Sequence, residues 1–316
     1  MNEALLGHTA IVLAAVLLDL LLGDPRWLPH PVVFIGRLIK ALEMLLRRRV
    51  SDELAGGVLL LALTVGITAL SAWLLLQAAF LIHPVVGAAL SALLGWTCLA
   101  ARSLHRESNR VAEALRVGDM DGARRSLSCI VGRDTAGLDE PAIWRAAVET
   151  VAENSSDGVI APLFCLMLGG PVLAIAYKAV NTLDSMVGYK NETYLRFGWA
   201  SARFDDLANW IPARLTGLLM VAAAPLAGLS LKGAWWIMVR DGRNHASPNS
   251  GIPEAAAAGA LGVQLGGASS YFGKRVDKPI IGDPLHPLSC AAYRGAVRLM
   301  YGAEALLVAA WLVFRI

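Results

Sequence analysis

Long apolar segments are the feature that most restricts how this chain can fold. A helix needs about 20 predominantly apolar residues to cross the hydrocarbon core of a bilayer. Only 17% of the 316 residues are charged, against about a quarter in soluble domains. The apolar segments cover residues 5–22, 54–82, 85–101, 158–180, 210–229 and 303–314, the last beginning near Ala292 if it crosses fully. The sequence therefore predicts an all-α, multi-pass integral membrane bundle with five or six apolar segments.

Charge and cysteine usage narrow the function classes. The net charge is only +3, and basic and acidic residues are interleaved, so we expect no nucleic-acid partner. The four cysteines are far apart and form no C-x-x-C pair: Cys98, Cys129, Cys165 and Cys290. We expect reduced thiols without a zinc or redox role, and no permanently bound cofactor.

Local signals predict where helices turn or break. His83-Pro84 indicates a tight turn between two apolar segments, and Gly169-Gly170-Pro171 favours a break within a third. Apolar residues at helical spacing around Gly118-Asp119, with a start signal at Asp139, predict helices in residues 102–157. We interpret residues 1–316 as one membrane domain, with 102–157 as a helical cytoplasmic cap and 231–302 as a long polar loop.

The polar stretches 23–53, 102–157 and 231–302 are rich in Lys and Arg, which places them in the cytoplasm by the positive-inside rule of the inner membrane. A single crossing by residues 158–180 would put the fourth stretch, 181–208, outside. Alternatively, the Gly169–Pro171 break divides that segment into two half-helices that enter and leave on one side, with 209–230 also re-entrant or interrupted at Pro225. Both topologies remain open.

Polar clusters at the ends of the apolar segments are candidate sites. Glu149 and Glu153 share a helix face, and Asp157 follows in a run of small polar residues. Carboxylates in this position suit a hydrated Mg²⁺, although a solvated helix face followed by a cap is the commoner structure. Lys178, Asn181 and Asp184 form a polar stripe that leaves an apolar segment. Such residues are functional candidates, whereas snorkelling would explain Lys178 alone.

Two further clusters lie in the second half of the chain. Lys190, Arg203, Asp205 and Asp206 precede the 210–229 segment, and these acids could instead complement the dipole of its helix. The run 240–254 contains Arg240, Asp241, Arg243, His245, Asn249 and Ser250. Forked arginine donors and turn-forming residues before a small-residue helix favour an anion-binding loop over an ordinary surface loop. The chain has no P-loop, Rossmann fingerprint, zinc-protease motif or nucleophile elbow.

Five motifs together resemble a known family. They are LDLLLGDPRWLPHP from Leu18, ETVAENSSDG from Glu149, KAVNTLDSMVGY from Lys178, ARFDD from Ala202, and RDG from Arg240. In this order, and over nearly the whole chain, they are similar to the CobD or CbiB family of cobalamin biosynthesis, the adenosylcobinamide-phosphate synthases.

The resemblance implies ATP-dependent amidation of the propionate f carboxylate of adenosylcobyric acid by (R)-1-amino-2-propanol or its O-phosphate. It implies Mg²⁺ and ATP as co-substrate, and other membrane corrinoid-pathway enzymes as possible partners. We assign the candidates by chemistry. Those for catalysis are Glu149, Glu153, Asp184 and His245; those for binding ATP or aminopropanol phosphate are Lys178, Asn181, Lys190, Arg203, Arg240, Arg243, Asn249 and Ser250; those for Mg²⁺ are Asp157, Asp205, Asp206 and Asp241.

Two other function classes stay open. Broken apolar segments with intramembrane polar residues are also typical of transporters, although no internal pseudo-repeat is evident. A non-catalytic membrane scaffold for corrinoid-pathway enzymes is the third hypothesis. Amide formation by the purified protein would distinguish the enzyme from both.

Overall fold

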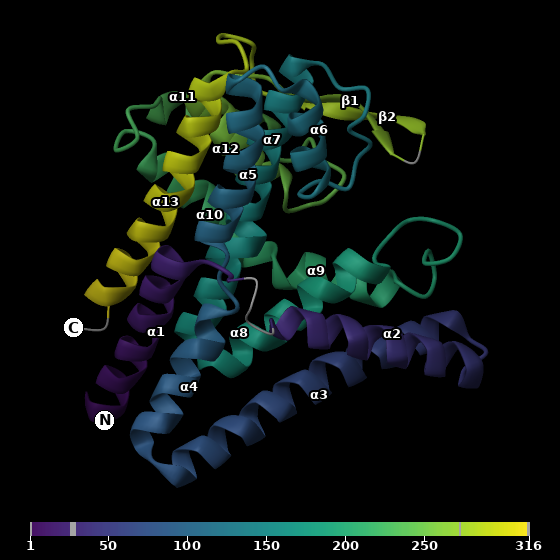
Figure 1. Ribbon diagram of the computed structural model, residues 1–316, viewed down its shortest axis with the longest axis vertical. Coiled ribbons are helices and arrows are strands. Elements are labelled where there is room, and N and C mark those ends of the chain that lie inside the picture. Colours follow the sequence, from purple (N-terminus) through teal and green to yellow (C-terminus); the bar gives the residue numbers. More distant parts are fainter. Residues whose placement is uncertain (1, 26–29, 272, 315–316) are drawn as a thin grey trace. The chain divides into compact units, whose positions relative to one another are not determined.

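The computed structural model describes residues 2–25, 30–271 and 273–314, whose elements are labelled in Figure 1. Arg26 and the rest of the Arg-Trp-Leu-Pro part of the first motif lie outside these residues. The chain divides into unit 1, Met1–Ala100 and Ala161–Asn209, and unit 2, Ala101–Ile160 and Trp210–Ile316. Each unit is built mainly from helices.

Four helical segments in the described part of the chain are long and apolar enough to cross a membrane: Glu53–Ile82, Pro84–Arg116, Glu140–Val187 and Cys290–Val313. Shorter apolar helices cover Gly7–Leu22 and Trp210–Ala223. The prediction of a multi-pass helical membrane protein is confirmed.

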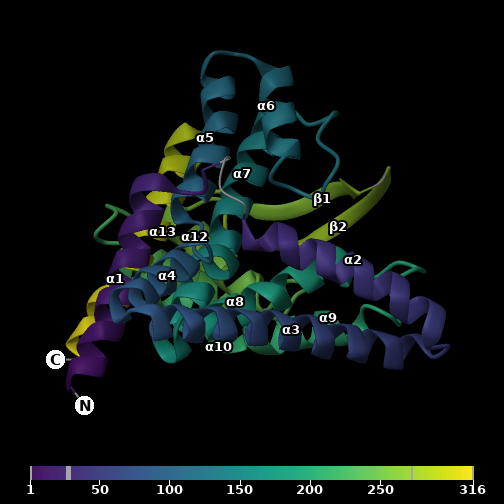
Figure 2. The ribbon, with the colours of Figure 1, turned by 60° about the horizontal axis from the view of Figure 1, so that its bottom comes forward.

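Unit 1 contains α1 (Asn2–Leu22), α2 (Pro31–Arg49), α3 (Glu53–Ile82), α4 (Pro84–Trp96), α8 (Ala161–Val187) and α9 (Trp199–Ala208). Helix α3 packs against α2, α4, α8 and α9, and Figure 2 shows α2 running beside it. Many side chains of α3 are exposed and apolar, as Leu70, Trp73 and Leu74 are. A helix that leaves such residues uncovered by protein suits a lipid environment.

The predicted turn at His83-Pro84 is present. His83 ends α3, and its Nδ1 accepts a hydrogen bond from the backbone N–H of Val85 at 3.2 Å. Pro84 occupies the first position of α4, where its missing N–H leaves no helical hydrogen bond unmade. One residue thus ends one helix and caps the next.

The predicted break in α8 is also present. Gly169 (φ −132°, ψ 17°) and Gly170 (φ 68°, ψ −167°) leave the helical conformation immediately before Pro171. The positive φ of Gly170 is accessible to glycine without steric cost, and Pro171 has no N–H to continue the ladder. A return of the chain to the same side of the membrane remains a prediction.

Unit 2 begins with α5 (Ala101–Arg116), α6 (Met120–Ser128), α7 (Glu140–Asn154) and a π-helical turn, η1 (Ser155–Ile160). It continues with α10 (Trp210–Ala223), α11 (Leu231–Asp241), α12 (Gly251–Leu261), strands β1 (Leu265–Tyr271) and β2 (Lys274–Ile281), and α13 (Cys290–Val313). Asp139 caps α7 as expected, accepting from the Ala142 N–H. Asp119, in the predicted turn, caps α6 by accepting from the Gly122 N–H. Helix α10 ends at Ala223, before Pro225.

Helix α7 lies in the core of unit 2. It packs against α5, α6, α12 and α13, and nearly every side chain from Ile143 to Ala152 is buried. A helix buried on all faces has no room for a solvated polar face. The solvated helix face considered for Glu149 is therefore wrong.

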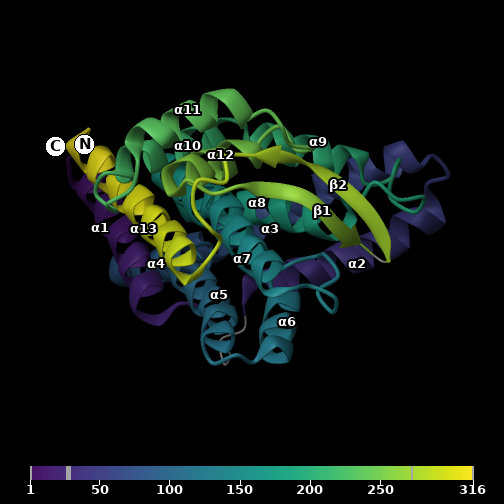
Figure 3. The ribbon, with the colours of Figure 1, turned by 90° about the horizontal axis from the view of Figure 1, so that it is seen from above.

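A two-stranded antiparallel sheet departs from the all-helical prediction. Strands β1 and β2 pair with Ala268 opposite Asp277 and Ser270 opposite Arg275, and Figure 3 shows them as a long hairpin. Asp134 holds its tip, accepting from the Ser270 hydroxyl at 2.7 Å and the Gly273 N–H at 2.8 Å. Residues 231–302 thus contain ordered helices and strands where a long polar loop was expected.

Candidate functional site

Glu149 is buried in α7 and fully hydrogen-bonded. Its Oε2 lies 2.5 Å from Nη2 of Arg133, and its Oε1 accepts the backbone N–H of Gly266 at 2.7 Å. Arg133 also donates to the Ser269 hydroxyl at 3.3 Å. A buried carboxylate needs such a cation and donors to remain charged. Glu149 therefore fastens α7 to the segment after α6 and to β1.

The backbone of β1 makes this contact possible. A bulge lies between Leu265 and Gly267, and Gly266 has a φ of +80°. A Cβ at Gly266 would lie 2.0 Å from the carbonyl oxygen of Pro279 on β2. Only glycine fits this close approach in this conformation, so the bulge presents the Gly266 N–H to Glu149.

A second buried acid, Glu254, lies at the start of α12 beside His245. The His245 Nε2 is 4.0 Å from the Glu254 Oε1, and both side chains are almost excluded from solvent. Burial raises the pKa of Glu254 well above its usual value, and the nearby Glu153 and Glu149 carboxylates raise it further. Burial and the neighbouring carboxylates thus both favour the protonated form of Glu254.

His245 is held neutral by the same environment. Burial lowers its pKa, although Glu153 acts in the opposite direction. Its Nδ1 accepts a hydrogen bond from the Ser247 N–H at 3.0 Å, so the neutral ring carries its proton on Nε2. Glu153, half-buried one turn beyond Glu149, lies within electrostatic reach of both His245 and Glu254. Structure thus brings three of the four predicted catalytic residues into one cluster.

An arginine lies in the loop that carries His245. Arg243 is exposed and has no ion-pair or hydrogen-bond partner in residues 2–25, 30–271 and 273–314. It lies near enough to Arg214 of α10 for the two to repel each other electrostatically. Arg214 in turn donates to the Asn249 side-chain oxygen at 3.2 Å, and half-buried Ser250 follows. Two neighbouring guanidinium groups suit an anionic ligand.

Arg240 and Asp241 are instead engaged within the fold. Arg240 donates from Nε and Nη2 to Asp241 at 2.8 and 2.7 Å, and from Nη1 and Nη2 to Asp283 at 3.0 and 2.9 Å. Asp241 also accepts the Gly282 N–H at 2.8 Å. These bonds lower the pKa of Asp241, chiefly through Arg240, and join α11 to the segment after β2.

Unit 1 carries a separate polar chain around Asp205. The Tyr177 hydroxyl donates to the Asn209 side-chain oxygen at 2.7 Å, and the Asn209 amide donates to Asp205 Oδ2 at 3.0 Å. Asp205 Oδ1 is buried, and among the described residues no donor meets the geometry of a hydrogen bond to it. Burial raises the pKa of Asp205 to about 7, and the charge of Asp184 adds to the rise. This oxygen is suited to a proton or a cation.

Most of the remaining predicted residues of unit 1 interact with Asp205 or Asp206. Asn181 and Asp184 on α8 are close enough to affect its titration. Arg203 is 3.8 Å from Asp206, and Lys190 also acts on Asp206 electrostatically. Lys178, half-buried on α8, lies within electrostatic reach of Cys98. The polar stripe and the acids after it thus converge within one unit.

No group of three or more His, Cys, Asp or Glu side chains in the described ranges has the geometry of a metal site. Asp157 lies half-buried in η1. Asp205, with its buried Oδ1, and the neighbouring Asp206 carry carboxylate oxygens, the ligand type that Mg²⁺ prefers.

Sequence reasoning missed four residues of these clusters: Arg133, Arg214, Glu254 and Lys278, the last of which acts electrostatically on His245. Arg133 had no distinguishing neighbours in the sequence. Arg214 did have a signal, because it is a charged residue within the predicted apolar segment 210–229. Glu254 did have a signal, because an acid in the last position of the 240–254 run opens an otherwise apolar helix.

The fold and the site define a polytopic membrane protein in which a buried His–carboxylate cluster lies in the same unit as paired arginines. Its sequence matches the profile described as "CobD/Cbib protein" over residues 12–300. The chain belongs to the CobD/CbiB family.

Curated relatives match more than nine tenths of the chain. The chain is 75% identical to "Cobalamin biosynthesis protein CobD" of Geobacter metallireducens, covering 95% of this chain and 94% of the relative. It is 62% identical to the protein of the same name from Pelobacter propionicus, covering 92% and 90%. It is 50% identical to "Cobalamin biosynthesis protein CbiB" of Salmonella arizonae, covering 95% of each. No solved structure matches the chain with statistical significance.

Proposed function

We propose that this protein acts in cobalamin biosynthesis as an ATP-dependent amide-forming ligase. It would join the propionate f carboxylate of adenosylcobyric acid to (R)-1-amino-2-propanol or its O-phosphate, at the cytoplasmic face of the inner membrane. The names of the relatives support the pathway. The observation that supports the chemistry is the cluster of Glu153, His245 and Glu254, in which His245 lies 4.0 Å from Glu254 and burial lowers the pKa of His245 and raises that of Glu254.

The reaction has two steps. An oxygen of the substrate carboxylate attacks the γ-phosphorus of ATP, and ADP leaves with the electrons of the broken P–O bond. The amine nitrogen then attacks the carbonyl carbon of the acyl phosphate, inorganic phosphate leaves, and the nitrogen loses a proton.

The cluster suits the second step. Glu153 is the proposed base that takes the proton from the amine nitrogen. His245 Nε2–H and protonated Glu254 are donors for the carbonyl oxygen and the leaving phosphate, where negative charge develops. Both oxygens of Glu149 are engaged, by Arg133 and by the Gly266 N–H, so its proposed role is to position α7 beside the cluster.

Arg243 and Arg214 are the proposed contacts for phosphate oxygens, with Asn249 and Ser250 lining the same loop. Within unit 1, and independently of the unit 2 cluster, Asp205 and Asp206 are the proposed ligands of Mg²⁺, which when bound would neutralise charge on phosphate oxygens. Lys190 and Arg203, beside Asp206, would assist in binding ATP, and the half-buried Lys178 and Asn181 are further candidates. The charge of Asp184 raises the pKa of Asp205, so Asp205 binds a proton more tightly.

The test uses full-length protein purified in detergent. It is incubated with adenosylcobyric acid, aminopropanol or its phosphate, and Mg-ATP, and the amide is detected by its mass. We expect product only with ATP present, loss of product in Glu153→Gln and His245→Ala, and retention in the exposed control Glu113→Gln. Absence of product from folded wild-type protein under all conditions would refute the ligase.

A transporter is supported by one observation, the break at Gly169–Gly170 in α8, because discontinuous helices often form substrate sites in transporters. Reconstitution in sealed vesicles tests it. Corrinoid flux without amide formation would favour the transporter over the ligase.

A further inference from the structure

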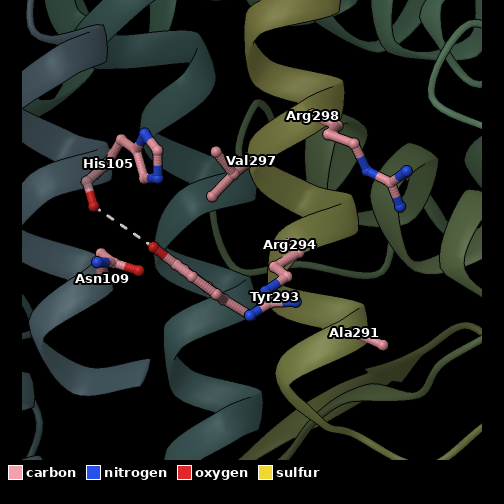
Figure 4. A pocket seen from close by; sticks show the side chains of 7 residues that line it. All are labelled: His105, Asn109, Ala291, Tyr293, Arg294, Val297 and Arg298. Carbon is pink, nitrogen blue, oxygen red and sulfur yellow. Dashed lines mark hydrogen bonds between the residues drawn. The ribbon is translucent and has the colours of Figure 1, made fainter. Parts of the chain in front are cut away.

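An open cavity of about 580 Å³ lies between α5 and α13 in unit 2 (Figure 4). Its walls are formed by His105 and Asn109 of α5 and by Ala291, Tyr293, Arg294, Val297 and Arg298 of α13. None of these lining residues is acidic. The walls therefore combine apolar surface with two permanent positive charges.

The two arginines are free to bind a ligand. Arg294 and Arg298 are four residues apart on α13, about one helical turn, and both line the cavity. Both are exposed, and neither has an ion pair or a hydrogen bond within the described part of the chain. Arg106 and Arg110 on α5 differ, because Glu107 pairs with both. Arg294 and Arg298 thus have no acidic partner among the described residues, whereas Arg106 and Arg110 do.

The cavity wall is held in place by contacts within the unit. The Tyr293 hydroxyl is 3.0 Å from the Ser108 hydroxyl and donates to the His105 carbonyl at 3.4 Å (Figure 4). Its ring centroid lies 6.3 Å from that of Trp144 on α7. His105 Nδ1 lies 3.2 Å from the Tyr301 hydroxyl. These contacts join α5 and α13 across the cavity floor, so the arginines are carried by a preorganised scaffold.

We propose that the α5–α13 cavity binds the phosphate group of a phosphate ester, with Arg294 and Arg298 as its ligands. Arginine is the residue best suited to phosphate because its planar fork donates two parallel hydrogen bonds. The cavity volume exceeds that of a bare phosphate, and the walls at Ala291 and Val297 accommodate an apolar remainder. The inference goes beyond the amidation and does not depend on it.

Two sources could supply this chemistry. A soluble phosphate ester could enter from water. Alternatively, a phospholipid headgroup could bind, because α13 is one of the helices apolar enough to cross the membrane, and its first turns carry both arginines. Basic pockets between membrane helices bind anionic headgroups in this way.

The experiment measures binding without turnover, so it is independent of the ligase assay. Delipidated full-length protein in detergent is titrated with inorganic pyrophosphate in one arm, followed by calorimetry, and with phosphatidylglycerol in the other, followed by native mass spectrometry. The variant is R294A/R298A. The matched control is R116A/R125A, which removes two exposed arginines of the same unit.

We expect R294A/R298A to weaken binding in at least one arm by roughly tenfold or more, since the charged hydrogen bonds of both guanidinium groups are lost, while the control binds as wild type. An effect confined to pyrophosphate identifies a soluble ester, and one confined to phosphatidylglycerol identifies a headgroup. Absence of binding to wild-type protein in both arms, or equal weakening in both variants, overturns the proposal. If R294A/R298A does not fold, R298Q alone provides the same comparison.

Discussion

Arg133 and Glu149 form an ion pair, 2.5 Å from Nη2 to Oε2, in which the side chains are only 9% and 4% exposed. The second carboxylate oxygen accepts a hydrogen bond from the N–H of Gly266, which follows Glu149 by 117 residues in the sequence. One side chain of α7 thus joins the segment before the helix to a strand near the end of the sequence. A carboxylate with both oxygens engaged in this way stabilises the fold of unit 2.

Removing one partner of this pair should destabilise the protein strongly. Glu149→Ala and Arg133→Ala should each lower the free energy of unfolding by about 3–5 kcal/mol, because the other charge stays buried and unpaired. The double variant should lose much less than the sum, since the pair is absent from both single variants. Denaturant unfolding in detergent measures the cycle. Glu113→Ala, at an exposed position, is the control. If the losses of the two single variants add up to the loss of the double variant, Arg133 and Glu149 do not stabilise the fold as a pair.

Helix boundaries could be predicted because their causes are local. His83 and Pro84 determine a turn through their own backbone and side chain, and Gly170 leaves the helix because glycine accepts a positive φ. The hairpin could not be predicted in the same way. Residues 265–271 read Leu-Gly-Gly-Ala-Ser-Ser-Tyr, without the β-branched alternation that indicates a strand. Its order depends on Glu149 and Asp134, which are remote in sequence.

The candidate site could likewise be predicted only in part. Glu149, Glu153 and His245 were found because clusters of polar residues near apolar segments are visible in the sequence. Their roles were not, because they depend on the environment. Glu149, predicted to be catalytic, forms an ion pair with Arg133. Glu254, which was not predicted, is the acid whose pKa burial raises well above its usual value. Burial and charge pairing are products of tertiary packing, and the sequence alone does not contain them.

Asp205 should make stability depend on pH. Its pKa is raised to about 7 by burial and by Asp184, from an ordinary 3.8. Between these two values the folded protein holds a proton that the unfolded chain has released, so stability should fall as pH rises and level off above about 7. Asp205→Asn cannot ionise. It should remove this contribution and raise the unfolding temperature at pH 8 more than at pH 5.

Thermal unfolding of the two proteins between pH 4 and pH 9, with a chelator present to exclude cations, tests this. The relevant quantity is the difference between wild type and Asp205→Asn at each pH, because other groups contribute equally to both. A difference that stays constant over this range would show that Asp205 is ionised in the folded protein.

Gly57 of α3 marks a close backbone contact within unit 1. A Cβ there would lie 1.9 Å from the carbonyl oxygen of Phe197, whereas a Cβ at Gly66 of the same helix would have no neighbour within 4 Å. Gly57→Ala should therefore lower the free energy of unfolding by about 1–3 kcal/mol through overpacking. Gly66→Ala should leave it unchanged or raise it slightly, because alanine favours the helix. Thermal unfolding in one detergent compares them, and equal effects would rule out the steric explanation.

Arg243 should contribute to ligand binding and not to stability. Its side chain is exposed and has no partner within the described ranges, so Arg243→Ala should leave the unfolding temperature unchanged. In the ligase assay, the loss of charged hydrogen bonds worth about 1.5–3 kcal/mol should raise KM for ATP or for aminopropanol phosphate by roughly tenfold or more. Arg125→Ala, an exposed arginine of α6, should change neither quantity. If Arg243→Ala has the KM and kcat of the wild type for both substrates, Arg243 does not contact either one. A rise in KM for one substrate alone would identify the phosphate that Arg243 contacts.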